Sequence, residues 1–280
     1  MAVQIIEQSI IPKCTGSKMC EDGLFINENY IAVIDGVTSK GKLTWPEKPV
    51  PGSQSMTSGC YAKEILLKAL QSMAPDMDGA GAMEYLNSAL SLACLTRRTI
   101  LEEKPEERLQ AVIILYSFYR REVWSFGDCQ CIINGIAHNH AKAIDSLLSE
   151  VRSFYIQAEL LSGVAEATLS GQDTGREYLL PLLRRQLLFA NQDSAYGYDV
   201  LNGFSIHPDH VIIYPIPPDS RLVLASDGYP LLKETLAESE NALMELIETD
   251  PLCFRENKGT KGLVHGNDSF DDRTYIRFDT

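Results

Sequence analysis

Short apolar runs rich in β-branched and aromatic residues occur along the chain beside longer segments in which apolar residues recur at helical spacing. The short runs predict β-strands over residues 2–11, 23–27, 30–34, 109–119, 122–126, 129–136, 196–203, 210–216, 221–225 and 273–278. The longer segments predict helices over residues 58–73, 82–101, 141–161, 176–189, 231–247 and 251–256. The strands therefore come in groups rather than in strict alternation with helices.

Short polar connections join the predicted strands. Glu28 and Asn29 form a turn between the strands at 23–27 and 30–34, and the three runs between residues 109 and 136 indicate three consecutive antiparallel strands. Hairpins and meanders are typical of antiparallel sheets, which long helices can cover on one face. We therefore expect a layered α/β (α+β) sandwich, built as one domain over residues 1–280, in preference to a Rossmann-like sheet.

The segment 41–55 shows neither the alternation of a strand nor the apolar spacing of a helix. It contains three prolines, two glycines and one tryptophan, Trp45. Such a composition predicts a loop or flap, and loops of this kind often border functional sites. We expect Trp45 to serve as a local packing anchor rather than as a substrate contact.

The composition narrows the possible functions. With 38 acidic and 25 basic residues the formal net charge is −13, which disfavours a nucleic-acid partner. The same acidity suits a protein that concentrates divalent cations at carboxylates, although it is also a common solubility feature. Charge alone therefore selects no function.

The cysteine content and the hydropathy of the chain indicate the cellular compartment in which the protein would be found. The seven cysteines lack the CxxC spacing of zinc sites and are odd in number, so we expect reduced and mostly buried thiols. Residues 1–11 lack a basic segment and are not expected to be a signal peptide, and no apolar run has the length of a membrane span. A cytoplasmic protein without membrane association is the resulting expectation.

Three apolar strands end abruptly in an aspartate, namely Asp35, Asp128 and Asp227, and glycine adjoins each of them. A single Asp-Gly pair is most often an ordinary turn. Three such strand ends, together with the acidic cluster Asp268, Asp271 and Asp272 before the last strand, would bring carboxylates together at sheet edges. Converging carboxylates need a cation, and Mg²⁺ or Mn²⁺ prefers oxygen ligands of this kind.

The order of these motifs resembles the PPM family of metal-dependent type 2C protein serine/threonine phosphatases. The motifs are Glu21-Asp22, Asp35-Gly36, Gly127-Asp128-Cys129, Ser226-Asp227-Gly228 and Asp271-Asp272-Arg273-Thr274. Each is weak alone, but together they follow the family's order over nearly the whole chain. The resemblance implies a four-layer αββα sandwich with two antiparallel β-sheets flanked by helices.

The resemblance also implies roles for particular residues. Asp35 would bridge two Mg²⁺ or Mn²⁺ ions, the Gly36 carbonyl would bind the first, and Asp227 and Asp271 would bind the second. Asp22 would hold a water at the metals, which makes Asp22 and Asp35 the catalytic pair, and Asp128 matches a residue that can help to hold a third ion. The implied reaction is hydrolysis of phosphoserine or phosphothreonine in a phosphoprotein, such as the target of a serine/threonine kinase, by water that the two cations activate.

The chain departs from the family at two places. The first aspartate continues into Val37-Thr38-Ser39 instead of further glycines, and Ser17 stands where the family often has a phosphate-binding arginine. Lys18 is the candidate substitute, with Lys13 as an alternative. A lysine lacks the bidentate fork of arginine, so weaker orientation of the phosphate would follow.

Two other classes of function stay open at this stage. A catalytically weak or inactive phosphatase-like domain could bind phosphoproteins or regulate a partner, given the missing arginine and the altered loop. A non-enzymatic domain could use the Asp-Gly pairs as ordinary turns. A cysteine-dependent phosphatase is excluded because no Cys-x5-Arg loop occurs.

Overall fold

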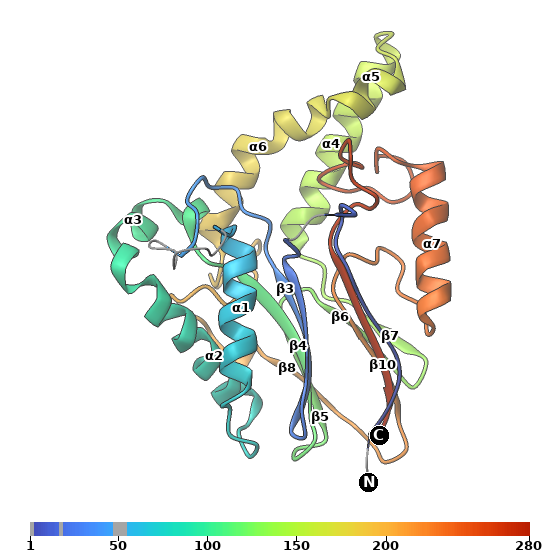
Figure 1. Cartoon of the computed structure of the whole chain (residues 1–280). Coiled ribbons are helices and arrows are strands. Elements are labelled where there is room, and N and C mark those ends of the chain that lie inside the picture. The colour runs from blue at the N-terminus through green and yellow to red at the C-terminus, as the bar shows by residue number, and fades with distance from the viewer. Residues whose placement is uncertain (1–2, 17–18, 47–54) are drawn as a thin grey trace.

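The computed structural model describes residues 3–16, 19–46 and 55–280. Within them, ten strands form two five-stranded antiparallel sheets that pack face to face (Figure 1). The first sheet has the strand order β2 (Asp22–Ile26), β3 (Tyr30–Gly36), β4 (Ala111–Ser117), β5 (Glu122–Phe126) and β8 (Ile212–Pro215). The second has the order β1 (Gln4–Ile11), β10 (Arg273–Asp279), β9 (Arg221–Ala225), β6 (Gln130–Ile133) and β7 (Ile136–His138).

Helices cover the outer faces of both sheets and one end of the sandwich. The first sheet is covered by α1 (Ser58–Leu70) and α2 (Gly79–Cys94), which continue into η1 (Leu95–Arg97), α3 (Arg98–Glu103) and η2 (Pro105–Glu107). The second sheet is covered by α7 (Leu236–Thr249). The end group comprises α4 (Ala143–Leu161), α5 (Glu166–Gly171), α6 (Thr174–Gln186) and η3 (Leu187–Phe189), while η4 (Pro208–His210) precedes β8. Figure 1 shows the resulting αββα layers, which confirm the expected sandwich.

Burial on both faces explains why the central strands are apolar without interruption. In β3, Ile31 and Val33 point between the two sheets, whereas Ala32 and Ile34 point toward α1 and α2. In β9, Leu224 joins the core between the sheets and Val223 joins the cluster under Leu236 at the start of α7. Because side chains alternate along a strand, a strand with two covered faces needs apolar residues at every position.

The predicted meander of three adjacent strands is wrong at its third strand. β4 and β5 pair with each other, but β6 pairs with β9 and β7 in the other sheet. The chain crosses between the sheets at Gly127, whose φ of +103° is rare for other residues, and a Cβ there would lie 2.2 Å from a Val112 methyl carbon. Only glycine fits this crossing.

Other predicted boundaries also change. Residues 196–203 make only isolated bridges at Tyr198 and Leu201, because their backbone groups bond irregular segments rather than a strand. Residues 251–256 form turns instead of a helix, since the Asp250 carboxylate accepts the N–H groups of Phe254 and Arg255. The single helix over 82–101 begins earlier, where Asp78 caps α2, and is interrupted by η1.

The remaining predictions concern single residues and one loop. Trp45 is buried, stacks on Tyr61 with ring centroids 5.6 Å apart and lies under Arg97, so its packing role is confirmed. Most of the 41–55 loop, residues 47–54, lies outside the described residues.

All seven cysteines are free and five of them are buried. In the described part of the chain, no helix combines the length and the apolar character that crossing a membrane requires.

Candidate functional site

The aspartates that end the strands come together at one end of the sandwich. Asp22 and Asp35 are direct cross-strand partners in β2 and β3, so their side chains share one face of the sheet. Asp227 follows β9, Asp128 lies at the crossing from β5 to β6, and Asp271 lies in the turn before β10. Both sheets therefore contribute carboxylates.

A cavity of about 170 Å³ opens among these residues. Four of the predicted carboxylates line it, namely Asp35, Asp128, Asp227 and Asp271. Asp22 is buried and is not among the lining residues. The other charged lining residues are Lys40, Lys142, Asp145, Arg176 and Lys261.

Close backbone packing at two glycines positions the strand ends. At Gly228 a Cβ would lie 2.0 Å from the carbonyl oxygen of Asp272, so the turn after Asp227 packs tightly on the turn that contains Asp271. The Gly36 carbonyl oxygen lies against α1, where a Cβ on Gly59 would be 2.8 Å from it. Gly36 itself is buried and is not a lining residue of the cavity.

Three carboxyl groups, Asp22, Asp35 and Asp227, have no cationic partner within ion-pair distance among the described residues. Burial, and then the charge of Asp227, raises the pKa of Asp35 well above its ordinary value. Burial likewise raises the pKa of Asp22 to about 8, although the 2.6 Å hydrogen bond that Ser226 Oγ donates to its carboxylate lowers the pKa in part. Burial also raises the pKa of Asp227, to about 6.

Burial is the main cause of the raised pKa values of all three carboxylates, and the negative charges of neighbouring aspartates add to it. Asp35 is partly exposed, Asp227 is exposed, and both line the cavity. A cation in the cavity would remove the repulsion among them.

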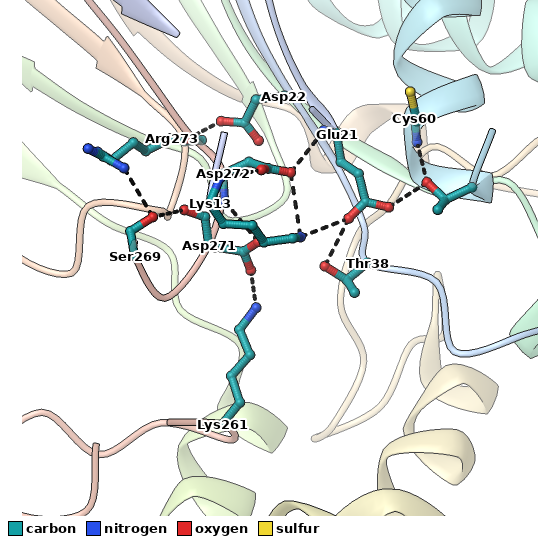
Figure 2. Close-up of polar contacts among 12 residues, drawn as sticks. Lys13, Glu21, Asp22, Thr38, Cys60, Lys261, Ser269, Asp271, Asp272 and Arg273 are labelled. Atoms are coloured by element: carbon teal, nitrogen blue, oxygen red, sulfur yellow. Dashed lines mark hydrogen bonds and ion pairs between the residues drawn. The ribbon is translucent and has the colours of Figure 1, made fainter. Parts of the chain in front are cut away.

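Asp271 is in the opposite electrostatic situation. Its carboxylate accepts hydrogen bonds from Lys13 Nζ at 2.9 Å and from Lys261 Nζ (Figure 2). Burial alone would raise its pKa, but Lys261 and Lys13 outweigh burial and lower the pKa to about 2. Asp271 is therefore ionised and already paired.

Asp128 also has a partner within the chain. Lys142, the residue before α4, donates to Asp128 Oδ2 at 2.6 Å, and both side chains are largely buried. The Lys142 ammonium group therefore binds the same carboxylate, Asp128, that the family resemblance implies as a ligand of a third metal ion.

Glu21 and Asp272 hold the backbone around the site. Asp272 is buried and accepts the backbone N–H groups of Lys13 (2.8 Å) and Glu21 (2.9 Å) (Figure 2), and it is not a lining residue of the cavity. Glu21 accepts from Lys13 Nζ at 3.1 Å, from Thr38 Oγ1 at 3.2 Å and from Thr57 Oγ1 at 2.7 Å. These bonds fix the loop after β3 to α1 and β1.

The proposed phosphate-binding lysine, Lys18, lies outside the described residues, as does Ser17. The alternative, Lys13, is engaged by Glu21, Asp271 and Asp272. Lys40, Lys142, Arg176 and Lys261 line the cavity although none of them belongs to an aspartate motif, so the sequence did not predict them as site residues. Lys40 stood closest to a motif, five residues after Asp35, whereas no sequence signal connects Arg176 to the aspartates.

The donor chemistry of the site fits a hard divalent cation. Asp22, Asp35 and Asp227 provide carboxyl oxygen atoms that no ammonium or guanidinium group of the described residues pairs with, and oxygen is the ligand that Mg²⁺ or Mn²⁺ prefers. Over residues 3–16, 19–46 and 55–280, however, no group of three or more His, Cys, Asp or Glu side chains is already arranged as a metal cage. Mg²⁺ commonly binds through one or two carboxylates and retains several waters, so a complete cage is not needed.

Solved structures match the chain from end to end. The catalytic domain of the serine/threonine protein phosphatase PstP in complex with two manganese ions matches at 15% identity, with 99% of both chains covered and a TM-score of 0.47. The PPM Ser-Thr phosphatase MsPP from Mycobacterium smegmatis, in complex with cacodylate, matches at 14% identity, with 99% of both chains covered and a TM-score of 0.46. RsbX in complex with magnesium matches at 12% identity, with 99% of both chains covered and a TM-score of 0.43.

No model of a known protein family and no curated protein sequence matches the chain. At these identities and TM-scores the structural likeness carries no conclusion about chemistry, which follows instead from the side chains in the cavity. The chain is similar over its whole length to solved phosphatases of the PPM family, the family that its ordered aspartate motifs resemble.

Proposed function

We propose that the protein hydrolyses phosphoserine or phosphothreonine in proteins with the help of Mg²⁺ or Mn²⁺. The observation that carries this proposal is the group of Asp22, Asp35 and Asp227, which come from both sheets and have no cationic partner in the described chain. Such a group is unfavourable in a folded protein unless it holds a cation.

In this proposal Asp35 and the Gly36 carbonyl would hold a first cation, Asp35, Asp227 and Asp271 a second, and Asp128 a third. When bound, the cations would supply Lewis acidity that lowers the pKa of a water molecule and stabilises negative charge on the phosphate. Asp22, beside Asp35, orients the attacking water, and the hydrogen bond from Ser226 keeps its carboxyl group in place.

The direct test is hydrolysis of p-nitrophenyl phosphate and of a phosphothreonine peptide with Mn²⁺, Mg²⁺ or a chelator. We expect cation-dependent turnover that falls at least about 100-fold in Asp35→Asn and in Asp227→Asn, because each variant removes a charge that the cations need. Asp209→Asn is the matched control, since Asp209 is exposed and does not line the cavity. Turnover that survives in both cavity variants, or that ignores chelator, would contradict the proposal.

A second candidate function rests on the lysines. Asp271 is paired with Lys13 and Lys261, and Asp128 is paired with Lys142. These ammonium groups compete with cations for two of the proposed ligands. A phosphatase-like domain with weak or no activity, which binds phosphoproteins, would show cation or phosphate binding without turnover in the same assay.

A further inference from the structure

Two basic side chains in the cavity, Lys40 and Arg176, form no ion pair with a carboxylate among the described residues. Lys40 follows β3 and lines both the cavity and a smaller neighbouring pocket, while Arg176 comes from the first turn of α6 and also lines the cavity. Figure 1 shows α6 lying beyond the ends of the strands, so the two basic groups come from elements outside the sheets.

The four basic residues that line the cavity fall into two kinds. Lys142 and Lys261 are neutralised by Asp128 and Asp271. The Lys40 side chain makes no hydrogen bond within the described residues. The Arg176 guanidinium group donates through Nη1 to the backbone oxygen (3.0 Å) and Oγ1 (3.1 Å) of Thr260, while the backbone N–H of Arg176 donates to Asp173 Oδ1. Arg176 is thereby anchored on one side and retains donors for another group.

Lys40 is half-buried and lies near other basic groups. Burial, followed by the charges of Arg176 and Lys142, lowers the pKa of Lys40 to about 8, although Asp145 opposes this shift. An ammonium group in such a place is partly shielded from water, and no carboxylate of the described residues forms an ion pair with it. A bound anion would supply both hydrogen-bond acceptors and negative charge.

We propose that Lys40 and Arg176 form an anion subsite that binds the phosphate group of a phosphomonoester in this cavity. The inference rests on the proposed function for the identity of the anion. A phosphomonoester carries close to two negative charges at neutral pH, which matches the two unpaired cations. Arginine provides a planar fork of donors for phosphate oxygens, and lysine provides a point charge.

This assignment also relates the two sets of charges in the cavity. The aspartates Asp35 and Asp227 attract cations, and Lys40 with Arg176 attracts the phosphate that those cations would share. The missing arginine near residue 17 is then compensated from α6 and from the loop after β3. An alternative role, in which both groups only balance nearby carboxylates, would affect stability but not phosphate affinity.

The test is calorimetric titration of inorganic phosphate into the full chain, with Mg²⁺ and separately with chelator. We expect measurable binding by the unaltered protein and about 10-fold weaker binding in each of Lys40→Gln and Arg176→Gln, as expected for loss of a charged hydrogen-bond donor. Lys40→Arg should stay within about threefold of the unaltered protein because it keeps the charge. Lys42→Gln and Arg185→Gln are matched controls, since both side chains are exposed.

The outcomes separate this inference from the proposed function. Loss of phosphate binding in Lys40→Gln and Arg176→Gln supports the subsite even if no turnover is detected. Unchanged phosphate affinity in both variants overturns the subsite, even where p-nitrophenyl phosphate is hydrolysed. No phosphate binding by the unaltered protein in either condition also overturns it. In an active protein, the two variants should raise KM for p-nitrophenyl phosphate, whereas a role confined to folding would lower only the thermal midpoint.

Discussion

At the scale of single residues, the pair of Lys142 and Asp128 shows how the chain balances charge at the cavity. Burial would lower the pKa of Lys142, but Asp128 and Asp145 outweigh burial and raise it. The ammonium group also lies 5.3 Å from the centroid of the Tyr198 ring, where a cation is favoured. One side chain thus supplies a positive charge that several neighbours stabilise.

Removing this ammonium group should be costly. We expect Lys142→Ala to lower the free energy of unfolding by about 3 kcal/mol, because Asp128 would keep a buried charge without a partner. Urea unfolding in chelator measures the loss. Mn²⁺ should restore part of it if Asp128 then accepts a cation.

The matched control is Lys258→Ala. Lys258 pairs with Glu150 on the surface, where both side chains are more exposed, so a loss of less than about 1 kcal/mol is expected. Equal losses in the two variants would show that Asp128 does not depend on Lys142.

At the scale of elements, the sequence predicts the strands that are buried on both faces and the aspartates at their ends. β3 and β9 stand out because an unbroken apolar run stops at Asp35 and at Asp227. Partner choice between sheets is not encoded in one strand's pattern, which explains why β6 was assigned to the wrong sheet. Segments held by side-chain bonds, such as that around Asp250, carry no periodic signal at all.

The end group of helices depends on one buried arginine in α4. Arg152 is fully buried and donates to both carboxylate oxygens of Asp173, at 3.1 and 2.6 Å. It also donates to the carbonyl oxygens of Leu252 (2.7 Å), Cys253 (3.1 Å) and Gly259 (3.2 Å). Since Asp173 caps α6 through the N–H of Arg176, this guanidinium group positions both α6 and the loop that carries Lys261.

We expect Arg152→Lys to lower the free energy of unfolding by about 3 kcal/mol, because an ammonium group cannot reproduce the five bonds of the guanidinium group. The loop at 250–262 should also become more sensitive to proteolysis under native conditions. Arg255→Lys is the control, as Arg255 pairs with Glu166 at the exposed surface. A protein that tolerates both substitutions equally would contradict this role of Arg152.

At the scale of the whole molecule, the site is a product of the sandwich rather than of any one segment. Asp22 and Asp35 come from the first sheet, Asp227 and Asp271 adjoin the second, and Asp128 lies on the crossing between them. The aspartates were predictable because each interrupts or adjoins a strand. The basic residues Lys40 and Arg176 were not, because their place at the cavity depends on how a loop and a helix fold over the strand ends.

The most direct test of the central claim, that this group of aspartates holds divalent cations, is a calorimetric titration of Mn²⁺ at two pH values. We expect binding at pH 7.5 that weakens at pH 5.5, because the raised pKa values of Asp22 (about 8) and Asp227 (about 6) let protons compete for the same carboxylates as the pH falls. Asp227→Asn should bind at least about 10-fold more weakly than the unaltered protein at pH 7.5. Absence of Mn²⁺ binding by the unaltered protein, or equal binding by Asp227→Asn, would contradict the claim.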